Sequence, residues 1–262
     1  ATMHGVAEKI GLFPSPEAVG ICQNREREKN FLRQHGIPCT AFWVIETLDD
    51  LTRAMAELNG AGVLKTADFG YDGKGQLKIT GGENPADVWE QFGKQRAVLE
   101  SWVPFEKEIS VMVVRSSDGE LRTYDPAENR HRNHILDVSI VPAGISIETS
   151  DTARAIAAQV AEALDYQGIL GVEFFVNHDG SLVVNEMAPR PHNSGHHTLD
   201  ACATSQFEQQ LRVALGLPLG STKLISSCVM LNLLGDFWPG ETEPPDWTPL
   251  LQTEGAVLHL YG

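Results

Sequence analysis

A glycine-rich segment between two strand-like stretches constrains the fold of this chain most. The segment reads Phe69-Gly70-Tyr71-Asp72-Gly73-Lys74-Gly75-Gln76, and the flanking stretches cover residues 62–65 and 76–79. A Walker P-loop or a Rossmann turn needs a helix directly after its glycines, so that the helix N-terminus meets the phosphate. Because a strand follows here, we interpret the segment as a lid whose backbone can approach phosphates closely. An ordinary hairpin turn is the alternative.

The composition limits the partners and the compartment. The chain has 262 residues, 42% of them hydrophobic, and a formal net charge of −15, so it can bury a full core and its field repels nucleic acid and anionic membranes. A nucleotide can still bind through local cations, backbone N–H groups and a divalent metal. The four cysteines form no C-x-x-C pair, and neither a signal peptide nor an apolar run of about 18 residues occurs. We therefore expect a soluble, cytoplasmic protein with reduced thiols.

The order of predicted elements indicates an α+β fold with two lobes and a pocket between them. We expect helices at 24–34, 47–58, 85–92, 151–164 and 205–215 and strands at 41–45, 62–65, 76–79, 97–103, 107–115, 120–124, 168–176 and 181–187. Charges dominate the first helix, so we expect it to be exposed. We assign residues 1–13 to the remnant of a preceding domain, 14–97 to a small lobe with the glycine-rich lid, and 98–262 to a large lobe with the metal and substrate loop.

Two glutamates lie within the apolar strands 168–176 and 181–187. If Asp179-Gly180 forms a two-residue turn, Glu173 lies directly opposite Glu186. Two carboxylates about 5 Å apart repel by roughly 3 kcal/mol at an effective dielectric constant near 20, so we expect a cation between them. Mg²⁺ suits such a pair because it prefers a few carboxylate oxygens plus phosphates, and Asn185 can supply a further oxygen. A solvent-facing pair, or carboxylates paired with arginine, is the alternative.

A polar loop follows the second of these strands and reads Arg190-Pro191-His192-Asn193-Ser194-Gly195-His196-His197. Its three histidines suggest a metal hydrolase, but the proline and the glycine preclude the helix that H-E-x-x-H zinc chemistry requires. The loop better suits an anionic or oxyanion-bearing substrate, although surface residues with no such role would give the same pattern.

Isolated charged residues elsewhere are weaker indications. Lys65 ends an apolar strand beside the lid and could serve as a point charge for phosphate. Glu100 lies at the expected lobe junction, where pockets commonly form. On their own, Arg25, Glu108 and His131 indicate little.

Taken together, these residues resemble the ATP-grasp ligases and, within them, the 5-(carboxyamino)imidazole ribonucleotide synthases of purine biosynthesis. The similar stretches are residues 70–76, 185–196, 205–209 and 232–236, and the second is long and specific. The resemblance covers nearly all of the chain from Pro14 onward. It implies an ATP-grasp fold with ATP between two α+β lobes, and carboxylation of 5-aminoimidazole ribonucleotide by bicarbonate through carboxyphosphate. ATP and Mg²⁺, or Mn²⁺ in its place, would be required, and the resemblance implies a homodimer.

The resemblance also implies roles for single residues. Glu173 and Glu186 match metal ligands. Arg190, Lys65, Tyr71 and Asp72 match catalytic positions, and substrate binding is implied for Tyr71, Asp72, Arg190, His192, Asn193 and Ser194. Nucleotide contacts are implied for Arg25, Lys65, Gly70, Tyr71, Asp72, Gly73, Lys74, Gly75, Gln76, Glu100, Val103, Glu108, His131, Asn185 and Glu186.

The chain departs from the family pattern at four points. A further Rossmann-like domain normally precedes Pro14, and a basic segment that holds the ribonucleotide phosphate normally follows Gly262. Asn24 stands where aspartate is usual, and His197 where tryptophan is usual. We therefore also consider another ATP-grasp ligase, or an ATP-binding fragment without turnover.

Overall fold

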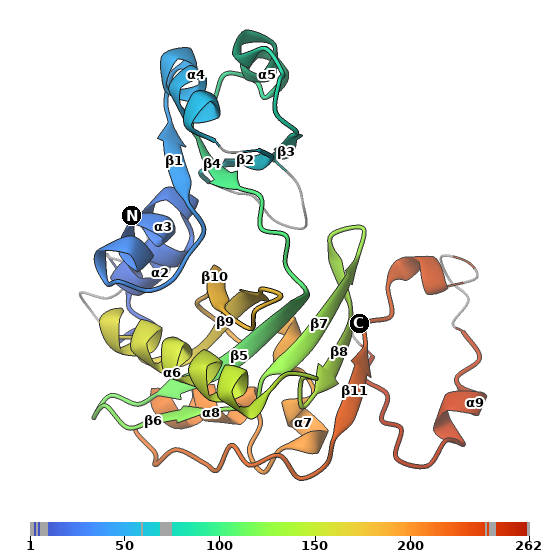
Figure 1. Cartoon of the computed structure of the whole chain (residues 1–262). Helices are drawn as coiled ribbons and strands as arrows, with labels where there is room; N and C mark the ends of the chain where they lie inside the picture. Colours follow the sequence, from blue (N-terminus) through green and yellow to red (C-terminus); the bar gives the residue numbers. More distant parts are fainter. Residues whose placement is uncertain are drawn as a thin grey trace.

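The computed structural model describes residues 10–58, 60–68, 75–238 and 245–260, together with Met3, Gly5 and Gly240. A small lobe stands on a broader large lobe (Figure 1). Most of residues 1–13, and residues 69–74 of the glycine-rich segment, lie outside the described residues. The expectations for Gly70, Tyr71, Asp72, Gly73 and Lys74 therefore stay predictions.

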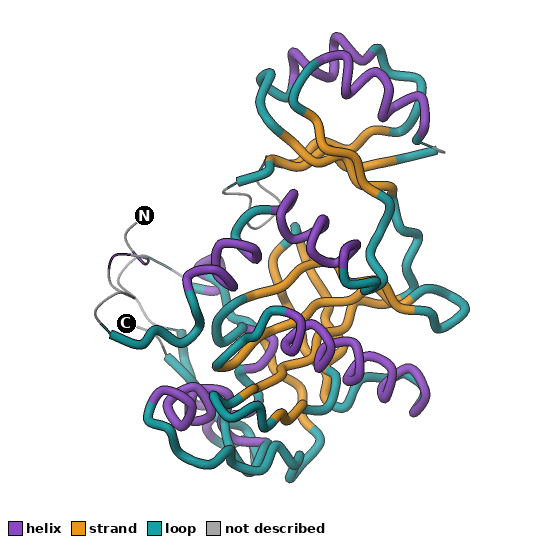
Figure 2. Tube along the Cα trace, turned by 90° about the vertical axis from the view of Figure 1, so that its left-hand side faces the viewer, coloured by secondary structure: helices purple, strands orange, loops and turns teal. Residues whose placement is uncertain are grey.

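The small lobe is an antiparallel sheet of four strands covered by two helices. The strand order is β1 (Phe42–Ile45), β4 (Ala97–Ser101), β2 (Gly62–Thr66) and β3 (Gln76–Ile79). Helices α4 (Leu48–Glu57) and α5 (Pro85–Gln91) pack together on the side of the sheet that faces away from the large lobe (Figure 2). Helix α4 begins at the expected cap: the Thr47 side chain accepts from the Asp50 backbone and the Asp50 carboxylate accepts from the Thr47 backbone, as in a capping box.

The large lobe is built on an antiparallel sheet with the order β10, β9, β5, β7, β8, β11, in which β6 also pairs with β5. The strands are β5 (Lys107–Arg115), β6 (Leu121–Thr123), β7 (Ala127–Arg132), β8 (Ile135–Val141), β9 (Gly168–Val176), β10 (Leu182–Ala188) and β11 (Cys228–Leu231). One face packs on α6 (Ile147–Ala163), α2 (Pro16–Cys22) and α3 (Arg25–Gln34). Helix α8 (Gln206–Ala214) covers one end of the other face, which leaves the opposite end of that face open.

The hydrophobic cores divide the chain differently from the expected lobe boundaries. Strand β4 pairs with both β1 and β2 at the centre of the small sheet, so the sheets separate after Ser101 rather than at residue 97. Phe31 and Leu32 of α3 pack into the core of the large lobe, although residues 14–97 were assigned to the small lobe. Packing thus places the region before Phe42 with the large lobe.

Two sequence expectations about helices are wrong. Helix α6 begins at Ile147, four residues before the expected start at 151, because the Ser146 side chain caps it by accepting from the Thr149 backbone. Helix α3 is not an exposed helix: Glu28 and Lys29 are buried together with Phe31 and Leu32. Their charged groups bond to β10 and to Glu100, contacts with segments far away in sequence.

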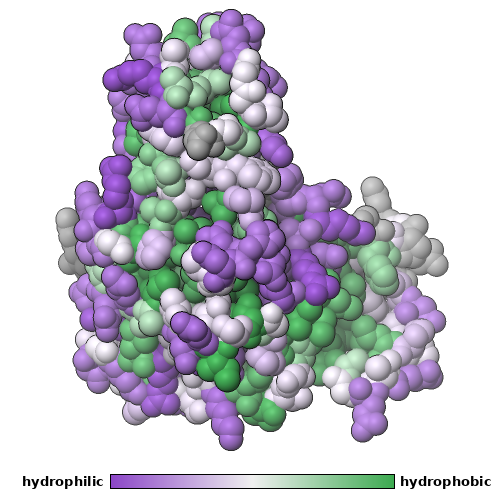
Figure 3. Space-filling model, viewed as in Figure 1, coloured by the Kyte–Doolittle hydropathy of each residue, from purple (hydrophilic) through white to green (hydrophobic). Residues whose placement is uncertain are grey.

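After β11 the chain continues as an arm with η2 (Gly235–Phe237) and α9 (Thr248–Leu251). Exposed apolar side chains gather along this part of the chain, including those of Val229, Leu231, Leu251 and Val257, where green surface lies between the body and the arm (Figure 3). In the described part of the chain no helix is both long and apolar enough to cross a bilayer. The four cysteines are free thiols.

Candidate functional site

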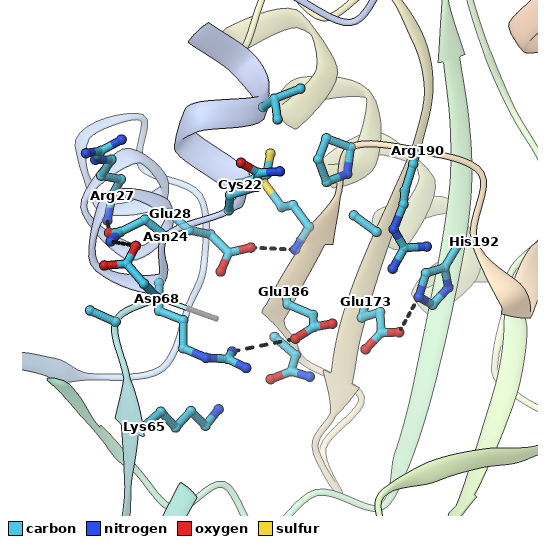
Figure 4. Close-up of a pocket in the computed structure, with 18 of the residues that line it drawn as sticks. Cys22, Asn24, Arg27, Glu28, Lys65, Asp68, Glu173, Glu186, Arg190 and His192 are labelled. Carbon is cyan, nitrogen blue, oxygen red and sulfur yellow. Dashed lines mark hydrogen bonds and ion pairs between the residues drawn. The ribbon is translucent and has the colours of Figure 1, made fainter. Parts of the chain in front are cut away.

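A cleft of about 930 Å³ opens at the uncovered end of the large sheet, beneath the small lobe. It brings together residues from α3, β2, β5, β7, β9, β10 and the loop after β10. Eleven of the residues singled out from sequence line it: Arg25, Lys65, Gln76, Glu108, His131, Glu173, Asn185, Glu186, Arg190, His192 and Asn193. Figure 4 shows Glu173 and Glu186 side by side, with His192 and Arg190 beyond Glu173 and Lys65 across the cleft.

The other expected residues lie around this cleft or outside the described part. Glu100 is buried behind it and bonds to Lys65, with 3.0 Å between Nζ and Oε2. Ser194 is buried against His192, 2.9 Å from Nδ1. Val103 is half-buried and does not line the cleft. Gly75 has φ +69°, and a Cβ there would lie 2.6 Å from Oγ1 of Thr66, so the backbone directly before β3 requires a glycine at this position.

Strand alternation explains why Glu173 faces the cleft. Successive side chains of a strand point to opposite faces, and in β9 the residues Leu170, Val172 and Phe174 lie in the core shared with α6. Glu173 therefore points to the other face. Gly171 lies on the same face, and a Cβ there would come within 3.1 Å of the His192 Cβ. The glycine leaves room for His192, whose Nε2 lies 3.4 Å from Oε1 of Glu173.

The expected pairing of Glu173 with Glu186 is confirmed, although the hairpin reaches it by a different route. The inner register pairs Leu182 with Val176 and Val184 with Phe174, which is one residue out of step with the expected turn. A β-bulge between Val184 and Glu186 then shifts the register, so that Glu186 pairs with Glu173. The turn is one residue longer than expected, and the extra residue Asn185 in the bulge restores the expected register at Glu186.

The carboxylates of the cleft repel one another. Burial raises the pKa of Glu173 well above its usual range, and Glu186 and Glu108 raise it further. Burial lowers the pKa of His192 to about 4, so this imidazole is neutral and cannot compensate Glu173. Arg25 lies 3.6 Å from Glu186. A divalent cation would relieve the remaining repulsion.

The donor set fits a magnesium ion that also binds phosphate. Glu173 and Glu186 provide carboxylate oxygens, and Asn185 adds an amide whose hydrogen bond lowers the pKa of Glu173. Among the described residues no three His, Cys, Asp or Glu side chains come together as a complete metal cluster, so ligands must also come from elsewhere. Mg²⁺ in phosphoryl-transfer sites is held in this way, by one or two carboxylates plus substrate phosphates.

The three histidines of the loop do not converge on one point. His192 contacts Glu173, His196 stacks on Phe207, and the His197 Nδ1 lies 2.9 Å from the Ser194 carbonyl oxygen. This arrangement gives no support to the zinc hydrolase alternative.

The opposite side of the cleft is positive. Burial lowers the pKa of Lys65, while Glu100 raises it again. Burial alone would raise the pKa of Glu100, but Lys29 and Lys65 together lower it. Two ammonium groups thus share one carboxylate, and the excess positive charge suits a phosphate. His131 pairs with Glu108 at 2.8 Å, a hydrogen bond that raises the pKa of His131.

Several residues of this region received no site role from the sequence alone. Glu28 lines the cleft, and so does Asp68, which accepts a hydrogen bond from Asn24 at 2.7 Å where α3 meets the end of β2. No local pattern distinguishes these polar residues from surface ones. The hairpin of β7 and β8, which carries His131, was also missed. Two signals could have revealed it. Residues 135–141 alternate between the two faces of a strand, and Asn133 before them has φ +53°, a conformation that asparagine tolerates better than most residues.

Comparison with known proteins agrees with this geometry. The model of the ATP-grasp domain matches residues 30–207. The N5-carboxyaminoimidazole ribonucleotide synthase of Brucella melitensis is 44% identical over 259 residues, which cover 98% of this chain and 70% of that protein. The chain belongs to this ATP-grasp family. The resemblance and the α+β fold expected from sequence are thereby confirmed, and the chain is an ATP-grasp ligase of this type.

Solved structures of the same family superpose closely on this ATP-grasp chain. The synthetase of Thermus thermophilus matches with a TM-score of 0.87 at 37% identity, covering 97% of this chain and 67% of that one. The synthase of Aspergillus clavatus, in complex with ADP and 5-aminoimidazole ribonucleotide, matches with a TM-score of 0.82 at 30% identity, covering 88% and 62%. The chain thus spans about two thirds of the length of these relatives.

Proposed function

We propose that this chain uses ATP to carboxylate 5-aminoimidazole ribonucleotide with bicarbonate, giving N5-carboxyaminoimidazole ribonucleotide for purine biosynthesis. The observation that carries the proposal is the placement of the carboxylate pair Glu173 and Glu186 between Lys65 and the Arg190 loop. It provides a metal and phosphate site next to cationic and polar groups for an anionic second substrate. The Aspergillus relative, which binds ADP and the ribonucleotide, supports the same substrates.

The cleft suits a reaction in two steps. A bicarbonate oxygen attacks the γ-phosphorus of ATP, and ADP leaves. The exocyclic amine of the ribonucleotide then attacks the carboxyl carbon of carboxyphosphate, and inorganic phosphate leaves. A divalent cation at Glu173 and Glu186 would offset charge on the phosphates. Lys65 would bind the phosphates from the small lobe, and Arg190 would stabilise carboxyphosphate by charge-assisted hydrogen bonds.

The remaining role assignments rest on the family resemblance, and the lining of the cleft is consistent with them. Gly75 and Gln76 lie at the base of the lid, while Arg25, Glu108, His131 and Asn185 line the nucleotide side of the cleft. His192 and Asn193 line the substrate side, and Ser194 supports His192. Mg²⁺ is the expected cation and Mn²⁺ can replace it. A homodimer, which the family resemblance implies, and a cytoplasmic location, which the spacing of the cysteines favours, complete the proposal.

ADP release tests the function directly. We expect release that requires ATP, Mg²⁺ and bicarbonate and that rises when 5-aminoimidazole ribonucleotide is added. Release that the ribonucleotide does not stimulate would contradict this substrate and favour another ATP-grasp ligase. Tight nucleotide binding without any ADP release would show a fragment without turnover.

The metal pair has its own test. Glu186→Gln removes one anionic ligand while keeping the side-chain volume, so we expect the Mn²⁺ affinity of the ADP-bound protein to fall by about 10-fold or more. Electron paramagnetic resonance of bound Mn²⁺ measures this affinity. Glu162→Gln on the exposed side of α6 is the matched control. If both variants bind Mn²⁺ like the unchanged protein, Glu186 is not a ligand.

A further inference from the structure

The direction of the Glu186 side chain depends on the bulge in β10. Leu182 and Val184 point into the core of the large lobe, so strict alternation would bury Glu186 on that same face. The bulge at Asn185 reverses the alternation. Met187 then enters the core instead, and Glu186 faces the cleft.

Strand β10 lies at the edge of the large sheet, so the backbone groups on its outer side need other partners. The segment before β1 and helix α3 supply them. The Val184 N–H donates to the Pro38 carbonyl oxygen at 2.8 Å. The Met187 N–H donates to the carboxyl group of Glu28. The carbonyl groups on both sides of the bulge accept from Lys29.

Lys29 is fully buried and its bonds are directed inward. Its Nζ lies 2.8 Å from the carbonyl oxygen of Asn185, 3.4 Å from that of Val184 and 3.6 Å from Oε2 of Glu100. The two carbonyl oxygens accept hydrogen bonds from the ammonium group, and the Glu100 carboxylate forms an ion pair with it. The side chain is 0% exposed and does not line the cleft, so it cannot act as Lys65 does, by contact with a phosphate.

We propose that Lys29 is a positioning residue that holds the β10 bulge in place and thereby aims Glu186 at the bound metal ion. Its ion pair with Glu100 connects the same strand to the small lobe, so one buried ammonium group links the proposed metal side of the cleft to the proposed nucleotide side. The inference rests on the proposed function insofar as Glu186 is a metal ligand there.

The variant Lys29→Met keeps most of the apolar stem and removes the donors. Without them, the two bulge carbonyl groups lose their partner and Glu186 loses its fixed direction. We expect the Mn²⁺ affinity of the ADP-saturated protein to fall about 10- to 100-fold, the usual effect of losing a group that orients a metal ligand. ADP affinity in the presence of EDTA should fall by a much smaller factor. Equal losses in both affinities would show a merely structural role and overturn the proposal.

Lys107→Met is the matched control. The Lys107 ammonium likewise bonds to a carboxylate and a backbone carbonyl, at 3.1 Å from Glu128 and 2.6 Å from Gly144, but it does not line the cleft or contact β10. We expect unchanged Mn²⁺ affinity for this variant. A comparable loss in Lys107→Met and Lys29→Met would overturn the positioning role.

Three further variants keep the test decisive. If Lys29→Met does not fold in urea titrations, Lys29→Gln, whose amide still donates to one carbonyl group, should show a smaller loss of the same kind. If neither folds, the role is in stability and the proposal is wrong. Glu173→Gln and Glu186→Gln report on the metal site itself. If they leave Mn²⁺ affinity unchanged, the proposed site fails; if they lower it while Lys29→Met does not, only the present inference fails.

Discussion

Glu28 is a carboxyl group in the wall of the cleft with almost no solvent contact. Burial raises its pKa from 4.5 to about 8, Lys29 opposes the shift, and Glu186 adds to it. Because the folded-state pKa exceeds the unfolded value, the folded protein binds this proton more tightly between about pH 4.5 and 8. The contribution of Glu28 to the free energy of unfolding is therefore present below pH 4.5 and is lost as the pH rises to 8.

The variant Glu28→Gln should remove this pH dependence. Its amide oxygen can still accept from Met187, and it never ionises. We compare how far the free energy of unfolding falls from pH 5 to pH 8 in the two metal-free proteins. The fall should be smaller in Glu28→Gln than in the unchanged protein, by at least about 1.4 kcal/mol, which is the value of one pKa unit. Urea unfolding at both pH values measures the difference, with Glu148→Gln on the exposed first turn of α6 as control. Parallel curves for Glu28→Gln and the unchanged protein would contradict the prediction.

At the residue scale, the sequence indicated the residues proposed to contact ligands better than the residues that support them. Glu173 and Glu186 stood out because each is a charge within an apolar strand. Glu28 and Lys29 lie in a helix full of charges, where nothing local marks which ones are buried. Their partners are residues 184–187 and Glu100, and only the folded chain brings these together.

Helix α8 shows how one element supports the polar loop 190–197 that follows β10. Ser205 caps it by accepting from the Glu208 backbone. The buried Gln206 side chain brackets His192, accepting from its N–H at 2.9 Å and donating to its carbonyl oxygen at 2.7 Å. Gln209 brackets Gly220 in the same way, at 3.0 and 2.7 Å. The motif 205–209 thus consists of a cap and two such amide brackets.

Because the two brackets are alike, they make a controlled comparison. Gln206→Leu and Gln209→Leu should each lower the free energy of unfolding by about 1–3 kcal/mol for every backbone group left unpaired. Only Gln206→Leu should also lower kcat/KM for the ribonucleotide, by up to about 100-fold, because a misplacement of 1 Å can have that effect. Urea unfolding and steady-state kinetics measure the two effects. A loss of kcat/KM in Gln209→Leu as large as that in Gln206→Leu would show that the effect is not specific to the loop.

At the element scale, most strands and helices were predictable where the sequence pattern was local. Helix α4 had its cap and its apolar spacing, and β9 and β10 had long apolar runs. The hairpin of β7 and β8 was missed because its tip, 130–134, is polar throughout. The β10 bulge could not be predicted, because the contacts that hold it come from residues 28, 29 and 38.

On the scale of the whole molecule, the two lobes have separate hydrophobic cores. One contains Leu51 and Leu64 of the small lobe, and the other contains Leu170 and Val172 of the large lobe. The described contacts between the two parts are largely polar. They include the pair of Arg96 with Glu26 and the hydrogen bond from Asn24 to Asp68. The lobe boundary expected between residues 97 and 98 divides β4, because nothing local in the sequence reveals which sheet that strand joins.

Separate cores predict separate local stability. Leu51→Ala and Leu170→Ala each truncate a leucine with 0% exposure, which typically costs about 2–5 kcal/mol. Leu51→Ala should accelerate amide hydrogen exchange in the small sheet and leave the large sheet protected. Leu170→Ala should accelerate exchange in the large sheet. Exchange read by mass spectrometry tests this. Uniform acceleration throughout the molecule in Leu51→Ala would mean that the lobes unfold as one unit.

Glu100 has two lysine neighbours on different sides, Lys65 toward the cleft and Lys29 in the interior. A buried carboxylate that loses its sole ion-pair partner costs about 3–5 kcal/mol, which would oppose any movement of that partner. On the proposed function, Glu100 avoids this penalty, because Lys29 would remain beside it when Lys65 turned to a phosphate. Lys65 would then exchange one anion for another, while Glu100 kept an ion pair in the interior.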